Sequence, residues 1–173
     1  MRKVILYIAM SLDGYIAKNN NDMSFLSIVQ KDGEDYGYND FIKEIDTVIM
    51  GRKTYDWVMT QVKEFPHVDI DSYIFTRTPA PSKGKISFYT GNLKELILEL
   101  KQNEGKNIFI DGGAEIVNLL MQDNLIDEYI ISIIPILLGD GLRLFKGSIM
   151  EQNLELIRSK QYKTGLIQLH YKR

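Results

Sequence analysis

The sequence contains no cysteine and only two histidines among its 173 residues. The lack of cysteine excludes disulfide scaffolds, thiol nucleophiles, cysteine-bound zinc and iron–sulfur clusters. There is also no excess of one charge, because 21 Lys and Arg face 23 Asp and Glu, for a net charge of -2 at pH 7. A nucleic-acid-binding protein needs a basic surface to neutralise phosphates, so we expect no nucleic-acid partner.

Long apolar runs are missing too. No stretch approaches the roughly 18 apolar residues of a membrane span, so we expect no membrane partner. Residues 1–12 begin with two basic residues, as a secretory signal would, but they lead into Asp13-Gly14 without a small-residue cleavage site. A buried strand is the preferred interpretation, and the cytoplasm is the expected location. The length predicts a single domain over residues 1–173, since no linker or repeat divides the chain.

Short apolar runs alternate with helical patterns along the chain. The runs cover residues 4–9, 47–50, 73–76, 86–89, 107–110 and 129–138. Because they are continuously apolar, they indicate strands covered on both faces, as in a mostly parallel sheet. Apolar spacing predicts helices over 93–104 and 114–122, and a third over 39–45. At the end of the chain, segments 154–162 and 166–171 flank Gly165 and predict an antiparallel hairpin. The fold class is therefore α/β.

A double glycine stands between a predicted strand and a predicted helix. Gly112 and Gly113 follow the run at 107–110 and directly precede Ala114. Glycines let a ligand approach the backbone, and the N–H groups that open a helix attract anions, so a pyrophosphate would fit here. A tight turn without a ligand is the alternative, since a Gly-Gly pair is not specific and the full GxGxxG fingerprint is absent.

Two further strand ends carry cations and hydroxyl groups. They are Gly51-Arg52-Lys53-Thr54, after the run at 47–50, and Thr76-Arg77, after the run at 73–76. In open α/β sheets, ligands bind beyond the carboxyl ends of the strands. Basic residues at one strand end are usually solvated, but three such ends together indicate a ligand with several phosphates, such as a dinucleotide. The cations would suit an additional 2′-phosphate and favour NADPH over NADH.

Five segments together resemble a known family. They are 11–17 (SLDGYIA), 46–55 (DTVIMGRKTY), 111–115 (DGGAE), 125–128 (LIDE) and 134–141 (IPILLGDG). Their order and content resemble the dihydrofolate reductase superfamily, and most closely its branch with the reductase domain of riboflavin biosynthesis. The resemblance covers essentially the whole chain. It implies a three-layer fold whose mostly parallel, eight-stranded sheet ends in an antiparallel C-terminal hairpin. It also implies hydride transfer from NADPH to a small heterocyclic or carbonyl substrate, pterin- or pyrimidine-like, and, by analogy, a homodimer.

The resemblance assigns roles to particular residues. It places nicotinamide contacts at Ala9, Ile16 and Ala17. It places phosphate and ribose contacts at Lys53, Thr54, Thr76 and Arg77, beside Gly51 and Arg52 of the same turns. It places the diphosphate turn at Gly112, Gly113, Ala114, Glu115 and Ile116. More loosely, it places Phe41 and Ile110 in the substrate pocket, for which plain core packing is an equal alternative.

The chain also departs from the dihydrofolate reductase pattern. Those enzymes have Pro-Trp after the first loop, whereas this chain has 19–25 (NNNDMSF), and its only tryptophan is Trp57. They also place a carboxylate early on the next helix. Glu34, Asp35 and Asp40 are near that position, and the spacing to Gly51 favours Asp35 as the catalytic carboxylate, with a solvated acidic loop as the alternative. These departures count against dihydrofolate as the natural substrate.

Other chemistries find little support. The zinc deaminase that accompanies the riboflavin reductase needs cysteines and is excluded within this chain. His67 lies in 65–71 (FPHVDID), which we interpret as a surface loop rather than a metal site, since no further ligand cluster supports a metal. A second class of function stays open: a nucleotide-binding or regulatory module that has the fold but no turnover.

Overall fold

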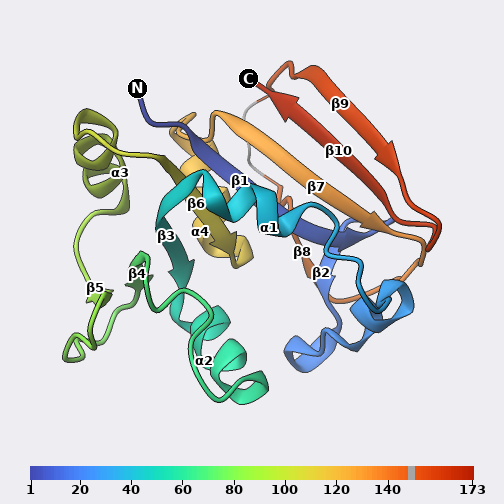
Figure 1. Ribbon diagram of the computed structural model, residues 1–173, viewed down its shortest axis with the longest axis horizontal. Helices are drawn as coiled ribbons and strands as arrows, with labels where there is room; N and C mark the ends of the chain where they lie inside the picture. The colour runs from blue at the N-terminus through green and yellow to red at the C-terminus, as the bar shows by residue number, and fades with distance from the viewer. Residues whose placement is uncertain (148–150) are drawn as a thin grey trace.

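The computed structural model describes residues 1–147 and 151–173. Eight strands form one sheet in the order β5-β4-β3-β6-β1-β7-β10-β9 (Figure 1). The sheet consists of β1 (Val4–Ser11), β3 (Ile45–Gly51), β4 (Asp71–Phe75), β5 (Ile86–Tyr89), β6 (Asn107–Gly112), β7 (Glu128–Ile134), β9 (Glu155–Gln161) and β10 (Ile167–Lys172). The short strands β2 (Tyr15–Ala17) and β8 (Leu142–Arg143) pair with each other beside it.

The strand directions confirm the predicted fold class. β1 runs parallel to its neighbours β6 and β7, and β3 runs parallel to β6 and β4, with β5 continuing the parallel set. β10 is antiparallel to both β7 and β9, which gives the predicted C-terminal hairpin. Parallel strands need crossover connections, and a helix supplies each of them except the one between β4 and β5, where residues 76–85 form the connection. This is the dihydrofolate reductase-like architecture that the resemblance implies.

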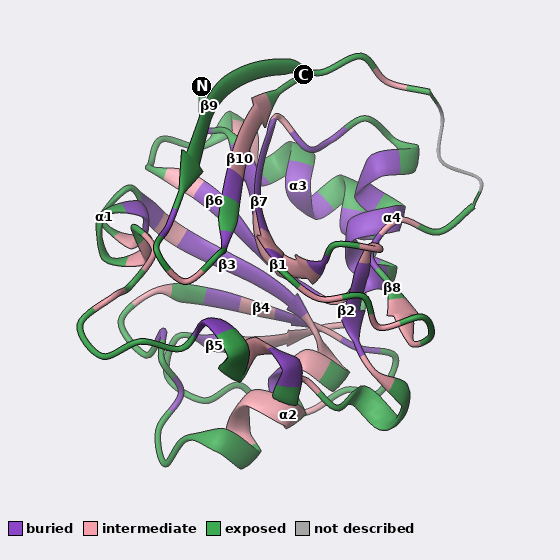
Figure 2. Ribbon diagram, turned by 90° about the vertical axis from the view of Figure 1, so that its right-hand side faces the viewer, coloured by how far each residue is buried: buried purple, intermediate pink, exposed green. Residues whose placement is uncertain are grey.

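Four helices cover the two faces of the sheet: α1 (Tyr38–Lys43), α2 (Arg52–Gln61), α3 (Leu93–Gln102) and α4 (Ala114–Gln122). One apolar cluster joins α3 and α4 to one face, and a second joins α1 and α2 to the other. The central strands are therefore mostly buried, while every residue of β9 is exposed (Figure 2). Short 3-10 helices, η1 (Asn19–Asn21) and η2 (Ser24–Val29), lie between β2 and α1.

The predicted elements agree with the structure to within a few residues, except at α2 and at the end of β7; the short elements β2, β8, η1 and η2 were not predicted. Helix α2 begins where only a turn was expected, and it was missed because Tyr55 is its one buried residue and its apolar pattern is weak. Strand β7 ends at Ile134 rather than 138, because Pro135 has no N–H to continue the ladder.

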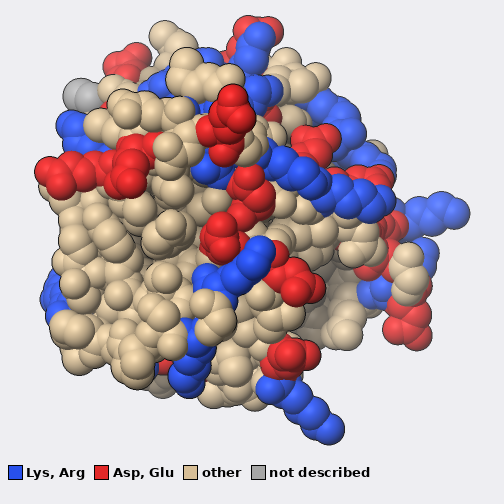
Figure 3. Space-filling model, turned by 60° about the vertical axis from the view of Figure 1, so that its left-hand side comes forward, with Lys and Arg blue, Asp and Glu red and all other residues tan. Residues whose placement is uncertain are grey.

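Among the described residues, no helix is long and apolar enough to cross a membrane. Acidic and basic side chains are interspersed over the face in Figure 3.

Candidate functional site

A cavity of about 670 Å³ lies at the carboxyl ends of β1, β3, β4 and β6. The chain reaches it from several separate segments, because parallel strands bring their carboxyl ends to one edge of the sheet. All fourteen residues expected to bind a cofactor line this one cavity: Ala9, Ile16, Ala17, Gly51, Arg52, Lys53, Thr54, Thr76, Arg77, Gly112, Gly113, Ala114, Glu115 and Ile116. The structure thus brings together the three strand ends that the sequence marked as suited to anions.

Two helices begin at the cavity without a side-chain cap. Helix α2 starts after Gly51 and α4 after Gly113, and neither N-terminus receives a side-chain hydrogen bond. Helix α3, whose residues do not line the cavity, is capped by Asn92, whose side chain accepts from the N–H groups of Lys94 and Glu95. The uncapped N–H groups of α2 and α4 carry partial positive charge and are available to an anion.

The two glycine turns lie close to the neighbouring helix where α2 and α4 begin, and the contact is tighter at Gly113. A Cβ on Gly113 would lie 3.1 Å from Thr54 Oγ1, and one on Gly51 would lie 3.4 Å from Ile116 Cγ1. Gly112 has φ +112°, a backbone conformation that residues with side chains rarely adopt. The Gly112–Gly113 peptide bond is cis. The two glycine turns therefore form a narrow cradle that side chains would fill.

The cavity also holds cations without partners. Lys53, Arg77 and Lys146 line it, and none of them forms an ion pair with another described residue. Arg52 differs, since its Nε donates to Asp56 Oδ1 at 2.7 Å and its guanidinium lies over the ring of Phe88. Three unpaired cations beside two open helix N-termini favour a ligand with more than one phosphate.

The opposite part of the cavity is apolar and aromatic. Tyr7, Tyr38 and Phe109 line it, with Tyr7 and Tyr38 in edge contact at 5.8 Å between ring centroids. Burial raises the pKa of Tyr7 to about 12, and burial together with the nearby Asp111 carboxylate raises the pKa of Tyr38. Both hydroxyl groups are therefore protonated at neutral pH. Tyr7 already donates its proton to the carbonyl oxygen of Tyr36 at 3.1 Å, so Tyr38 is the tyrosine whose hydroxyl proton is available to a ligand. Such walls suit a flat ring.

Three of the expected site residues lie outside the cavity lining. Asp35 is exposed and closes the turn before α1, where it accepts hydrogen bonds from the N–H groups of Gly37 and Asn39, and these bonds lower its pKa. Phe41 packs behind the wall against Tyr7 and Phe109, with ring centroids 4.7 and 5.0 Å away. Ile110 is fully buried in the core. Asp35 therefore lies in a solvated turn, and Phe41 and Ile110 pack in the core.

Besides Glu115, the cavity lining contains the carboxylate of Asp111, to which the sequence assigned no role of its own. It follows Ile110 near the end of β6, and its side chain is 26% exposed. Burial raises its pKa, while the neighbouring His67 acts in the opposite direction. The expectation of a surface loop over 65–71 was wrong for two residues, since Phe65 is 3% and His67 5% exposed. The apolar Phe65, two positions before His67, was the feature of the sequence that could have indicated a buried segment.

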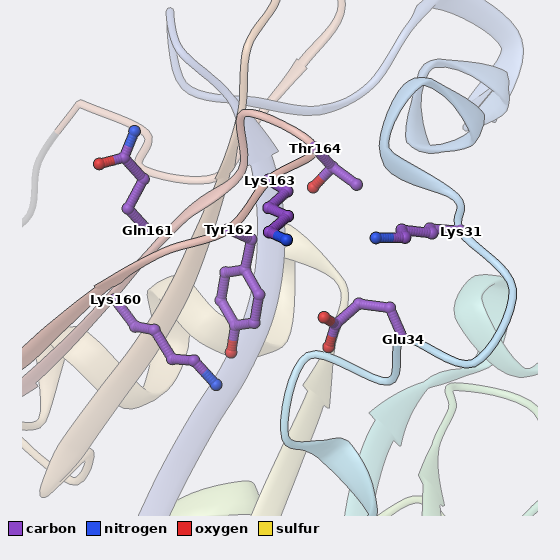
Figure 4. Close-up of a pocket in the computed structure, with 7 residues that line it drawn as sticks. All are labelled: Lys31, Glu34, Lys160, Gln161, Tyr162, Lys163 and Thr164. Atoms are coloured by element: carbon purple, nitrogen blue, oxygen red, sulfur yellow. The ribbon is translucent and has the colours of Figure 1, made fainter.

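A second hollow, of about 290 Å³, lies between the 31–34 loop and the β9–β10 hairpin. Lys31 and Glu34 face Lys163 and Thr164 across it (Figure 4). Lys160 lies over the ring of Tyr162, with its Nζ 4.4 Å from the ring centroid. None of the predicted cofactor residues lines this hollow, so the larger cavity is the candidate site.

Comparison with known proteins agrees with this geometry. The family model of the RibD C-terminal domain matches residues 2–168. The chain belongs to this family. The membership confirms the resemblance to the riboflavin-biosynthesis branch of the dihydrofolate reductase superfamily. Uncharacterized protein YwjB of Bacillus subtilis is 42% identical over 173 residues, which cover 99% of this chain and 98% of that protein.

Solved structures show the same fold in other members of the RibD group. A putative riboflavin biosynthesis protein from Shewanella superposes with a TM-score of 0.90 at 29% identity, covering 99% of this chain and 98% of that one. The Thermotoga maritima deaminase/reductase superposes with a TM-score of 0.76 at 14% identity, covering 99% of this chain and 56% of that one. At that identity the second likeness shows the fold alone.

Proposed function

We propose that this RibD-type domain is an NADPH-dependent reductase of a small heterocyclic or carbonyl substrate, pterin- or pyrimidine-like, acting in the cytoplasm. The observation that carries the proposal is the make-up of one cavity. At one end are two uncapped helix N-termini and unpaired cations, and at the other are aromatic walls and a carboxylate. The first end suits a dinucleotide and the second suits a flat ring to be reduced.

The residues fit NADPH, and the glycine cradle is the test of that fit. Gly113 leaves room where a Cβ would meet Thr54, so a diphosphate can approach the start of α4. Lys53 and Arg77 are free to bind the 2′-phosphate, which favours NADPH over NADH. Ala9, Ile16 and Ala17 offer small or apolar contacts to the nicotinamide. When bound, NADPH supplies the hydride, and the protein contributes orientation and exclusion of water.

The substrate end favours a planar ring with a nitrogen or carbonyl group. Tyr38 can donate from its hydroxyl group, and Asp111 can exchange a proton with a ring heteroatom. The names of relatives support the pyrimidine class: the Thermotoga protein is a 5-amino-6-(5-phosphoribosylamino)uracil reductase, and a Corynebacterium diphtheriae relative is a pyrimidine reductase-like protein.

Two measurements, made one after the other, test the proposal. Nicotinamide fluorescence and calorimetry should detect NADPH binding to the purified protein, and absence of binding to well-folded material would end the proposal. Loss of NADPH absorbance should then follow addition of one member of a panel of pterins, aminopyrimidines and quinones. NADPH binding without reduction of any member, together with retention of a partner protein, would instead support the regulatory module.

The homodimer expected from the resemblance is also a proposal. β9 is an outer strand of the sheet, and all seven of its residues are exposed, including Leu156 and Ile157. An unpaired edge of this kind is available to a second chain. Light scattering coupled to size exclusion should give twice the mass of 20.0 kDa. A monomer at micromolar concentration would contradict it.

A further inference from the structure

His67 occupies an unusual place for a residue of a connecting segment. It lies between α2 and β4, yet only 5% of it is exposed, and it does not line the cavity. Its Nε2 is 3.7 Å from Oδ2 of Asp111, which does line the cavity. The imidazole is therefore next to the carboxylate but outside the cavity lining.

The surroundings of His67 fix its ring in this place. Phe65 and Phe109 contact it edge-on, with interplanar angles of 84° and 89°. Its carbonyl accepts a hydrogen bond from the N–H of Ile70 at 3.0 Å, which closes the turn that carries it. A polar side chain buried among aromatic rings loses hydration, and such burial is costly unless a polar partner compensates. Asp111, at 3.7 Å, is the charged group beside the imidazole, at ion-pair rather than hydrogen-bond distance.

We propose that His67 is a positioning residue, which orients the Asp111 carboxyl group toward the cavity and stabilises its ionised form after it gives its proton to the substrate. The inference rests on the proposed reductase function. Reduction of a C=N bond adds a hydride from the cofactor to carbon and a proton to nitrogen. The O–H bond of Asp111 breaks as the new N–H bond forms, and the carboxylate then regains a proton from water.

Two opposing effects act on the pKa of Asp111, so this pKa should depend on His67. Burial disfavours the ionised carboxyl group of Asp111 and raises its pKa, whereas the neighbouring imidazole lowers that pKa. Tyr38 of α1 also faces Asp111, and Lys53 of α2 and Glu115 of α4 are exposed groups on the same cavity wall. Without His67, Asp111 would hold its proton more tightly and would release it less readily.

The chain offers a matched control in its other histidine. His170 of β10 lies beside Glu128 of β7, with Nε2 2.8 Å from Oε2, and neither residue lines the cavity. His67→Gln and His170→Gln therefore make the same chemical change in two histidine–carboxylate pairs. Only one of these pairs borders the proposed reaction site.

The test follows the carboxyl carbon of Asp111 by ¹³C NMR during a pH titration, with Asp111→Asn used to assign the signal. His67→Gln should raise the Asp111 midpoint by about one pH unit, and His170→Gln should leave it unchanged. An unchanged midpoint in folded His67→Gln would overturn the proposal, as would an equal shift in His170→Gln. The measurement needs no substrate, so it can fail independently of the reductase function.

A measurement on the wild type covers the case in which His67→Gln does not fold. Long-range ¹H–¹⁵N correlation identifies the protonated nitrogen of each neutral imidazole, and His170→Gln assigns the two histidines. Nε2 of His67 should carry the proton, toward Asp111, and a bare Nε2 would overturn the proposal. Where a panel substrate is reduced, the alkaline decline of kcat/KM should move to higher pH in His67→Gln, and an unmoved profile would contradict the role.

Discussion

The two ends of the parallel strands are built in opposite ways. At the amino ends, charged side chains are buried and paired: Arg2 donates to Thr47 Oγ1 and the carbonyl of Lys106, both at 2.6 Å, and pairs with Asp46. Asp127, before β7, accepts from Lys101 at 2.7 Å. At the carboxyl ends Lys53 and Arg77 form no ion pair with another described residue, although Arg52 pairs with Asp56, and helices α2 and α4 lack side-chain caps. Stability is concentrated at one end, while the other keeps its polar groups free for a ligand.

Arg2→Ala should produce the largest effect, and this effect should be on the free energy of unfolding alone. Arg2 is 6% exposed and also donates to the carbonyl of Leu100, so its removal takes the cation from Asp46 and the donor from the carbonyl groups of Leu100 and Lys106. Breaking a buried charge network of this kind costs about 3 kcal/mol. Urea denaturation should show that loss, with NADPH affinity of the folded protein unchanged.

Lys85→Ala is the control for Arg2→Ala, since the Lys85–Asp71 pair is exposed and 3.9 Å long. Such surface pairs contribute about 0.5 kcal/mol or less. Equal losses in the two variants would show that the amino ends are not the stabilised end of the sheet.

Gly113→Val should act at the other end and on binding alone. The added side chain would approach Thr54 Oγ1 and fill the cradle at the start of α4. NADPH affinity should fall by about 100-fold, equivalent to ~2.7 kcal/mol, by calorimetry. At Gly147 an added Cβ meets open space, so Gly147→Val serves as the control. Retained NADPH binding in Gly113→Val would remove this glycine from the diphosphate site.

Arg77→Ala should distinguish the two nicotinamide cofactors. Arg77 lines the cavity without an ion pair to another described residue, so its guanidinium is free for the 2′-phosphate. Its loss should weaken NADPH about tenfold, or ~1.4 kcal/mol, and leave NADH almost unaffected. Arg143, which stacks on Tyr15 outside the cavity lining, provides the control Arg143→Ala. An equal loss for both cofactors would place the 2′-phosphate elsewhere.

The sequence predicted the part of the site that depends on local pattern. Strand, glycine turn and helix follow each other within a few residues at Gly112–Gly113, so spacing alone placed this turn at the carboxyl edge. The sheet was predictable for the same reason, because buried parallel strands are continuous apolar runs. The order of the strands in the sheet brings these turns together at one cavity, and this order cannot be predicted from local sequence pattern.

The carboxylate chemistry could not be predicted in this way. Asp35 was chosen by its distance along the chain from Gly51, but its carboxyl group is used by the backbone of its own turn. Asp111 and His67 meet only because the segment after α2 folds back under the sheet and buries Phe65 beside it. A contact between separate segments depends on packing, and no periodicity in the sequence reports it.

The smallest expected effects compare the two histidine–carboxylate pairs through pH. Burial raises the pKa of Asp111, so the folded state holds the proton more tightly and stability falls as pH rises through that window. Burial alone would also raise the pKa of Glu128, but hydrogen bonds from Lys3 and His170 outweigh it and lower that pKa, so stability falls as pH drops. At pH 7, Asp111→Asn should therefore stabilise the protein and Glu128→Gln destabilise it. Urea denaturation between pH 3 and pH 8 should show both differences shrinking toward the acid end. If both variants changed the free energy of unfolding in the same direction at pH 7, the two histidine–carboxylate pairs would not differ in their effect on stability.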